Sequence, residues 1–129
     1  MAVTIGVLKE TVRGENRVAV VPEVATRLAA LGAKVLIERD AGSAARFPDS
    51  LFKDASFADS ADAVLAAADL LFTVQPPDAA LVSKLKPGAA LAGFLAPHNQ
   101  AALVRALKEK RITSFAMELV PRISRAQSM

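Results

Sequence analysis

Short apolar runs alternate with amphipathic stretches along the whole chain, and this alternation predicts strands and helices in turn. Five runs have the length and the Val, Ile, Leu and Phe content of buried strands. They cover residues 3–8, 34–38, 70–74, 89–94 and 112–116. Several stay apolar at successive positions, as parallel strands covered on both faces do. The pattern therefore predicts an α/β fold around an open parallel sheet of about five strands.

The segments between these runs carry residues that begin and end helices. The capping positions are occupied by Pro22, Gly32, Asp59 or Ser60, Asp78 and Asn99. Proline suits the first helical position, glycine suits the position after the last, and Ser, Asp and Asn suit the N-cap. Right-handed crossovers would place helices on both faces of the sheet, and we expect a flavodoxin-like strand order of 2-1-3-4-5. Residues 40–58 show no regular period apart from a short helical turn near Leu51.

The composition is that of one domain with its own core. The chain has 129 residues, 53% of them hydrophobic, without an internal repeat or linker, so residues 1–129 are interpreted as a single α/β lobe. The lack of cysteine excludes disulfides and thiolate metal sites. The net charge of +3 is spread along the chain, which argues against nucleic-acid binding. The longest uncharged run, residues 87–104, is too polar to span a membrane, and the N-terminus does not resemble a signal peptide.

Ligands of open parallel sheets bind beyond the carboxyl ends of the strands, so the residues there are the candidates for chemistry. The dinucleotide fingerprint G-x-G-x-x-G is missing after the first strand, where Gly6 lies within the strand and Gly14 is the next glycine. Asp40 follows the second strand as a ribose-binding acid would, but without the glycine loop it is interpreted as a turn residue. We therefore expect that this lobe does not bind a dinucleotide pyrophosphate by itself.

The single histidine does not predict a catalytic or metal site. His98 follows Pro97 and precedes a helix cap, and it is interpreted as an exposed residue at the entry to a helix. No serine is placed to pair with it as a nucleophile. Carboxylates do not cluster at ligand spacing, so no metal site is predicted.

The last fifteen residues carry the densest functional chemistry of the chain. They begin with Phe115 at the end of a strand that is expected to be buried, and they run through Pro121 into Arg122, Arg125 and Gln127. Arginine offers a fixed fork of donors, and glutamine both donates and accepts, so together they suit a planar amide or an anionic group. A basic C-terminal tail is the alternative interpretation.

Residues 117–129 closely resemble the nicotinamide-site loop in the NAD(H)-binding domain of proton-translocating transhydrogenases. The resemblance implies that Arg122 and Gln127 lie at the nicotinamide, as catalytic and cofactor-binding residues. It also implies that Ser124 and Arg125 bind the cofactor in the same loop, with less defined roles. That loop continues in the family with Asp-x-Leu-Ser-Ser, which this sequence lacks, so the site as given is incomplete.

A second block, residues 15–22, resembles a segment shared by alanine dehydrogenases and transhydrogenases. The resemblance implies that Arg17 faces an interdomain cleft. In alanine dehydrogenases this arginine binds the substrate carboxylate, a use that suits a bidentate guanidinium. Gln75 stands where that family has its catalytic lysine, and Ala96 stands where it has a histidine. Because reductive amination needs such acid–base groups, the transhydrogenase resemblance is favoured.

Hydride transfer between two nicotinamides needs two rings held about 3–3.5 Å apart and no general acid or base. The resemblance therefore implies an enzyme part that moves hydride between NADH and NADP+, coupled to proton translocation by a membrane-spanning partner. NAD(H) would be shared with a second, Rossmann-type lobe of the same domain, which this sequence lacks, and NADP(H) would be held by a partner component. The isolated chain is expected to be inactive. The resemblance also implies a place at the cytoplasmic face of a bacterial membrane and allows a homodimer of the complete protein.

Two alternatives remain open at this point. The first is a lobe of an alanine-dehydrogenase-like amino-acid dehydrogenase. The second is a stand-alone binding module with a flavodoxin-like fold. A phosphoacceptor version of that module would need carboxylates at the end of the first strand, where Lys9 precedes a single Glu10.

Overall fold

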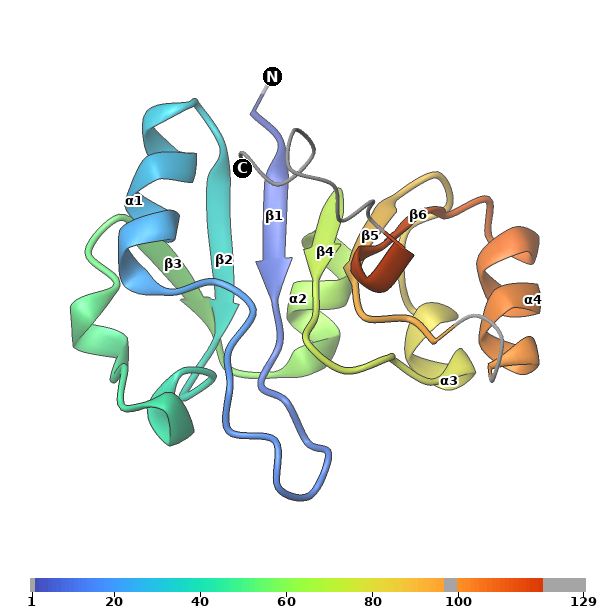
Figure 1. Ribbon diagram of the computed structural model, residues 1–129. Coiled ribbons are helices and arrows are strands. Elements are labelled where there is room, and N and C mark those ends of the chain that lie inside the picture. The colour runs from blue at the N-terminus through green and yellow to red at the C-terminus, as the bar shows by residue number, and fades with distance from the viewer. Residues whose placement is uncertain (1, 97–99, 120–129) are drawn as a thin grey trace, which may run out of the picture.

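The computed structural model of the protein describes residues 2–96 and 100–119, which form an open parallel sheet with helices on both faces (Figure 1). The strands are β1 (Thr4–Val7), β2 (Lys34–Glu38), β3 (Ala55–Ala58), β4 (Leu70–Phe72), β5 (Ala90–Gly93) and β6 (Thr113–Ala116). The helices are α1 (Pro22–Ala30), α2 (Ala61–Ala67), α3 (Ala79–Val82) and α4 (Ala101–Glu109). Single 3-10 turns cover Ser43–Ala45, Asp49–Leu51 and Met117–Leu119.

The strand order confirms the predicted topology. Within the described residues the sheet has six strands in the order β3-β2-β1-β4-β5-β6, all paired in parallel. The five predicted strands correspond to β1, β2, β4, β5 and β6, and their order is the expected 2-1-3-4-5. The sequence analysis missed β3, which lies in the stretch that shows no regular period. Its residues, Ala-Ser-Phe-Ala, include no β-branched side chain, and β3 gains its strand conformation by pairing with β2 at the border of the sheet.

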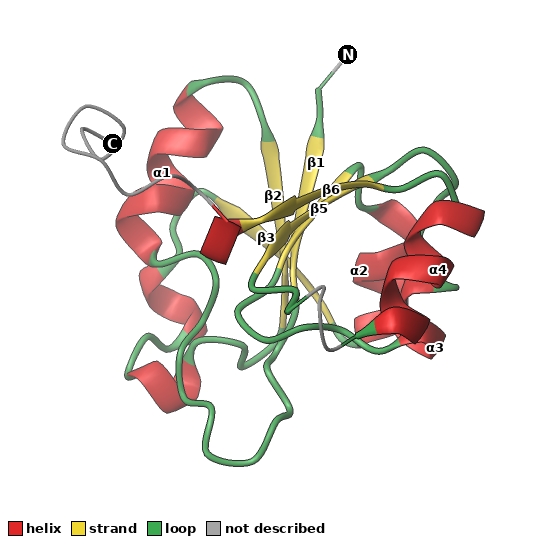
Figure 2. Ribbon diagram, turned by 45° about the vertical axis from the view of Figure 1, so that its right-hand side comes forward, coloured by secondary structure: helices red, strands yellow, loops and turns green. Residues whose placement is uncertain are grey.

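Each face of the sheet carries its own core. Helix α1 covers the face over β1 and β2, where Ala25 packs with Val7, Val35 and Ile37. Helices α2, α3 and α4 cover the opposite face, as Figure 2 shows. A close approach between α2 and β1 depends on Gly6, because a Cβ there would lie 2.8 Å from Val64 Cγ1. The predicted two-sided coverage is therefore confirmed.

Several helix ends in the described residues use predicted capping residues, and of the alternatives Asp59 and Ser60 the cap of α2 is Ser60. Ser60 Oγ accepts a hydrogen bond of 3.2 Å from Ala63 N, and Asp78 Oδ1 accepts one of 2.8 Å from Leu81 N. Gly32 follows α1 with a φ of +95°, a conformation that glycine adopts without strain. Asn99, the expected cap of α4, lies outside the described residues, and Gln100 occupies the N-cap position. None of the helices in the described part of the chain is long and apolar enough to cross a membrane.

The expectation that Phe115 ends a buried strand is wrong. β6 lies at the border of the sheet, and Phe115 is 55% exposed. The Cα of Phe115 pairs with that of Ala92 in β5, so the Phe115 side chain lies on the same face of the sheet as α1. Helix α1 covers that face only over β1 and β2. The apolar sequence therefore predicts the strand correctly here, but it does not predict whether a helix covers the strand.

Candidate functional site

The connections of the sheet reverse direction between β1 and β4, and this reversal locates the candidate site. From β1 the chain builds β2 and β3 on one side, then returns to form β4, β5 and β6 on the other. In open parallel sheets the strand ends on either side of such a reversal leave a crevice at the carboxyl end, where ligands bind. We call the carboxyl ends of β1 and β4 the switch point.

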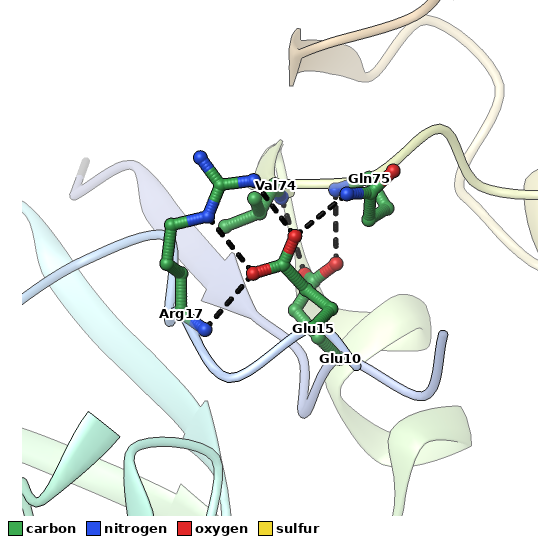
Figure 3. Close-up of polar contacts among 5 residues, drawn as sticks. All are labelled: Glu10, Glu15, Arg17, Val74 and Gln75. Carbon is green, nitrogen blue, oxygen red and sulfur yellow. Dashed lines mark hydrogen bonds and ion pairs between the residues drawn. The ribbon is translucent and has the colours of Figure 1, made fainter. Parts of the chain in front are cut away.

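Glu10 bridges the switch point. It follows β1, and its carboxylate accepts hydrogen bonds from two successive peptide groups after β4 (Figure 3). Oε2 lies 3.1 Å from Val74 N, and Oε1 lies 2.9 Å from Gln75 N. A carboxylate that accepts two backbone N–H groups satisfies donors that the strand end leaves unpaired. Glu10 thus fixes the position of Gln75 relative to β1.

Glu15 lies beside this bridge and joins the loop after β1 to Gln75. Its side chain is only 6% exposed. Oε1 accepts from Gln75 Nε2 at 2.6 Å and from Arg17 Nη2 at 2.8 Å, while Oε2 accepts from Arg17 Nε at 2.9 Å and from Arg17 N at 3.0 Å. The hydrogen bonds from the Arg17 side chain, and then that from Gln75, lower the pKa of Glu15 to about 2. Glu15 is therefore a carboxylate at any physiological pH.

Arg17 reaches out of this network toward the end of β5. Glu15 binds the guanidinium through Nε and Nη2 and raises the pKa of Arg17. The Cζ atom of Arg17 lies 6.0 Å from the ring centroid of Phe94, within the range of a cation–π contact. The side chain is 63% exposed, so its unbonded N–H groups are accessible to solvent.

The end of β5 carries a second carboxylate bridge. Glu118, in the turn after β6, accepts a hydrogen bond of 3.1 Å from Leu95 N and one of 2.8 Å from Ala96 N. Ala96 has a φ of +44°, in the left-handed region that non-glycine residues seldom occupy. The bridge from Glu118 holds the backbone after β5 in this conformation.

The structure brings together only some of the residues that the sequence analysis singled out. Arg17 and Gln75 meet at the switch point through Glu15. Asp40 lies in a turn after β2, as expected. Ala96 follows β5 and offers no functional group. The remaining candidates all lie outside the described residues, namely His98, Arg122, Ser124, Arg125 and Gln127.

The sequence analysis did not assign a role to the acidic residues that build the site. Glu10 and Glu15 follow β1 and bind groups of Gln75 after β4, while Glu118 follows β6 and binds peptide groups after β5. One signal was available, because Glu10 lies just beyond the end of the first strand and Glu15 stands two residues before Arg17. The contact of Glu15 with Gln75, sixty residues away, had no signal in the sequence.

This arrangement offers hydrogen bonds and charge rather than proton transfer. Glu15 stays ionised and Arg17 stays protonated around neutral pH, and Gln75 does not titrate. In residues 2–96 and 100–119, no group of three or more His, Cys, Asp and Glu side chains could hold a metal ion. Two hollows border the switch point, with volumes of about 250 and 270 Å³. Both are smaller than the roughly 300–1,000 Å³ of common small-molecule sites, so neither hollow alone would enclose a small molecule.

Comparisons with known proteins agree with this picture. The chain is 41% identical over 127 residues to NAD(P) transhydrogenase subunit alpha of Cereibacter sphaeroides, a match that covers 97% of the chain and 24% of the relative. The structure superposes on that of a transhydrogenase from Sinorhizobium meliloti with a TM-score of 0.90 and 34% identity, covering 98% of this chain and 38% of the other. An L-alanine dehydrogenase structure is a weaker match, with a TM-score of 0.87 and 26% identity over 95% of this chain and 34% of the other.

The chain thus spans less than half of the length of each of these relatives. A family model described as "Alanine dehydrogenase/PNT, N-terminal domain" matches this chain. The model of this family matches residues 6–129 and so includes the C-terminal stretch that resembles a nicotinamide-site loop. The chain therefore belongs to the alanine dehydrogenase/PNT N-terminal domain family.

Proposed function

We propose that this chain is the N-terminal lobe of the NAD(H)-binding component of a proton-translocating transhydrogenase. The complete enzyme would move hydride between NADH and NADP+. The observation that carries the proposal is the hydrogen bond of 2.6 Å between Gln75 Nε2 and Glu15 at the switch point. The resemblance aligns Gln75 with the catalytic lysine of alanine dehydrogenases, and this hydrogen bond supports a fixed, neutral amide at that position.

A site of this kind suits direct hydride transfer. The hydride passes as one unit between two nicotinamide carbons, so the protein needs to align the rings and exclude water. Glu15 stays ionised and Arg17 stays protonated near neutral pH, Gln75 does not titrate, and Ala96 brings no acid–base group from the end of β5. The same groups would serve reductive amination poorly, because that reaction protonates and deprotonates its intermediates.

The cofactors and partners follow from this assignment. NAD(H) would lie between this lobe and a second lobe that binds adenosine and pyrophosphate, and the small hollows at the switch point support such a shared site. Arg122 and Gln127 would contact the nicotinamide, with Ser124 and Arg125 in the same loop. NADP(H) and the proton channel would belong to partner components, and the complex would lie at the cytoplasmic face of a bacterial membrane. A homodimer of the complete component is part of the same proposal.

A second candidate is an alanine-dehydrogenase-like enzyme. One observation favours it: Arg17 is well exposed at the switch point and keeps unbonded N–H groups that could bind a carboxylate. This candidate lacks groups for acid–base chemistry at Gln75 and Ala96.

The decisive experiment uses the full-length protein together with its partner components. We expect hydride transfer from NADH to an NADP+ analogue, and no NADH oxidation that depends on pyruvate and ammonia. The opposite pair of results would assign the chain to the amino-acid dehydrogenases and overturn the proposal.

A further inference from the structure

We propose that Glu15 is a positioning residue, which holds the guanidinium of Arg17 so that its remaining N–H donors face the crevice at the switch point. The acceptor would be a planar oxygen-bearing group, which under the proposed function is the carboxamide of the nicotinamide. The identity of this acceptor rests on the proposed function. The holding of Arg17 by Glu15 rests on the geometry alone.

The loop that carries Glu15 is itself fixed. Glu15 N donates a hydrogen bond of 2.9 Å to Val12 O, which closes a turn over residues 12–15. Gly14 has a φ of +84° in this turn, a conformation that favours glycine. The carboxylate of Glu15 also accepts a hydrogen bond of 3.0 Å from Arg17 N, which fixes the backbone of Arg17 relative to Glu15.

Gln75 fixes the carboxylate of Glu15 from the other side. Its backbone N–H is bound to Glu10, and its side-chain amide donates to Glu15 Oε1 at 2.6 Å. Because the Gln75 amide is neutral, it orients the Glu15 carboxylate without forming an ion pair that would compete with Arg17. A continuous set of hydrogen bonds therefore runs from the end of β1, through the end of β4, to Arg17 (Figure 3).

The guanidinium of Arg17 is held along one edge and faces an aromatic ring. Glu15 binds the edge formed by Nε and Nη2, and the Phe94 ring lies 6.0 Å from Cζ. A guanidinium has five N–H donors, and Glu15 uses two, so three remain. Those three make no hydrogen bond with the described residues, and they project from a side chain that is 63% exposed.

A second Arg–Glu pair on the same chain provides a comparison. On α1, Arg27 Nη2 lies 2.8 Å from Glu23 Oε1, and both side chains are 75% exposed. One exposed contact of this kind holds a side chain weakly. Arg17 instead has two guanidinium hydrogen bonds to a nearly buried carboxylate. Such preorganisation is what a group needs if it is to orient a reacting ring.

The holding of Arg17 is tested on this chain by the exchange of arginine Nε–H protons with water, followed by NMR. We expect the Arg17 proton to exchange roughly tenfold more slowly than that of Arg27, because Arg17 Nε donates to the nearly buried Glu15, whereas Arg27 contacts Glu23 through Nη2. Glu15→Gln should bring Arg17 close to the rate of Arg27. Glu23→Gln is the matched control and should leave Arg17 unchanged. Equal rates for Arg17 and Arg27 in the unaltered chain would overturn the proposal.

The consequence for function is tested in the complete enzyme with its partner components. Glu15→Gln should lower kcat roughly tenfold while the Kd for NADH changes less than about threefold, because a positioning group acts on the rate. The double variant Glu15→Gln/Arg17→Ala should be no slower than Arg17→Ala, because Glu15 acts through Arg17. Additive losses would show that Glu15 acts independently, and unchanged turnover in Glu15→Gln would refute a role in positioning.

The two proposals can fail separately. If the unaltered complete protein transfers no hydride, the proposed function is overturned, and the exchange measurement still decides whether Glu15 holds Arg17. If hydride transfer is intact but the Arg17 proton exchanges freely, the function stands and the positioning role falls.

Discussion

A single methyl group added to Gly93 tests the contact between β4 and β5 next to the candidate site. Gly93 ends β5, and an alanine Cβ there would lie 2.5 Å from Thr73 Oγ1 and closer still to the carbonyl oxygen of Thr73. The nearest obstacle is a backbone atom, so no change of side-chain rotamer relieves the overlap. We therefore expect Gly93→Ala to force the ends of the two strands apart.

The magnitude follows from two opposing effects. Alanine is favoured over glycine inside a strand by about 0.5–1 kcal/mol, because glycine loses more conformational freedom on folding. Overpacking a well-filled site costs about 1–3 kcal/mol, and a backbone obstacle favours the upper part of that range. Gly93→Ala should therefore lower the free energy of unfolding by about 1–2 kcal/mol. Urea denaturation followed by circular dichroism measures this as a lower midpoint at unchanged slope.

A companion variant identifies the atom responsible. The hydroxyl of Thr73 is buried and has no hydrogen-bond partner in the described part of the chain, so Thr73→Ala removes it without breaking a bond. The carbonyl oxygen of residue 73 remains in that variant. Adding Gly93→Ala to Thr73→Ala should therefore lower the free energy of unfolding by as much as Gly93→Ala does in the unaltered chain. A full recovery would assign the overlap to the hydroxyl. A Gly93→Ala variant as stable as the unaltered chain would refute the reasoning altogether.

Three further predictions concern the cofactor and pH. In the complete enzyme, Arg122→Ala and Gln127→Asn should slow hydride transfer much more than they weaken NADH binding, and Arg125→Ala should have a milder effect. Stopped-flow measurement of the transfer rate and titration with NADH separate the effect on rate from the effect on binding. The isolated chain should have negligible affinity for NADH by calorimetry, and micromolar binding would contradict this. The pKa of Glu15 is lowered to about 2 from 4.5, so its stabilising contribution should be complete above pH 4.5 and lost as the pH falls through about 2. Acid titrations of Glu15→Gln should show a smaller loss of stability over that range, and an unchanged profile would count against the Arg17 contact.

Sequence patterns were sufficient where local preference and tertiary structure agree. Residues 34–38 were predicted as a strand with the observed bounds, because alternate side chains such as Val35 and Ile37 enter one core. Ser60 was one of two predicted caps, beside Asp59, because a capping side chain acts on its own helix. In contrast, β3 depends on pairing with β2, and its own residues have little strand preference. Burial of β6 depends on which parts of the sheet the helices reach, and local sequence does not specify this.

The residues of the candidate site also fall into two groups, those that the sequence indicated and those that only the folded sheet brings together. Arg17 and Gln75 were singled out because their short sequence contexts resemble a known family. Glu15 and Gln75 approach only after β1 and β4 become neighbours in the sheet, so their contact arises from topology. The bridges from Glu10 and Glu118 likewise join segments that pair only in the folded sheet.

Those two bridges also determine which anions this lobe can accept. Pairs of peptide N–H groups at the carboxyl ends of strands are ready sites for phosphate. After β4 and β5 such pairs already hold the carboxylates of Glu10 and Glu118. A phosphate would have to displace a covalently tethered anion and would meet its negative charge. Under the proposed function, this surface would disfavour the phosphates of the cofactor, so the pyrophosphate of a dinucleotide would be directed away from it while the nicotinamide ring could approach.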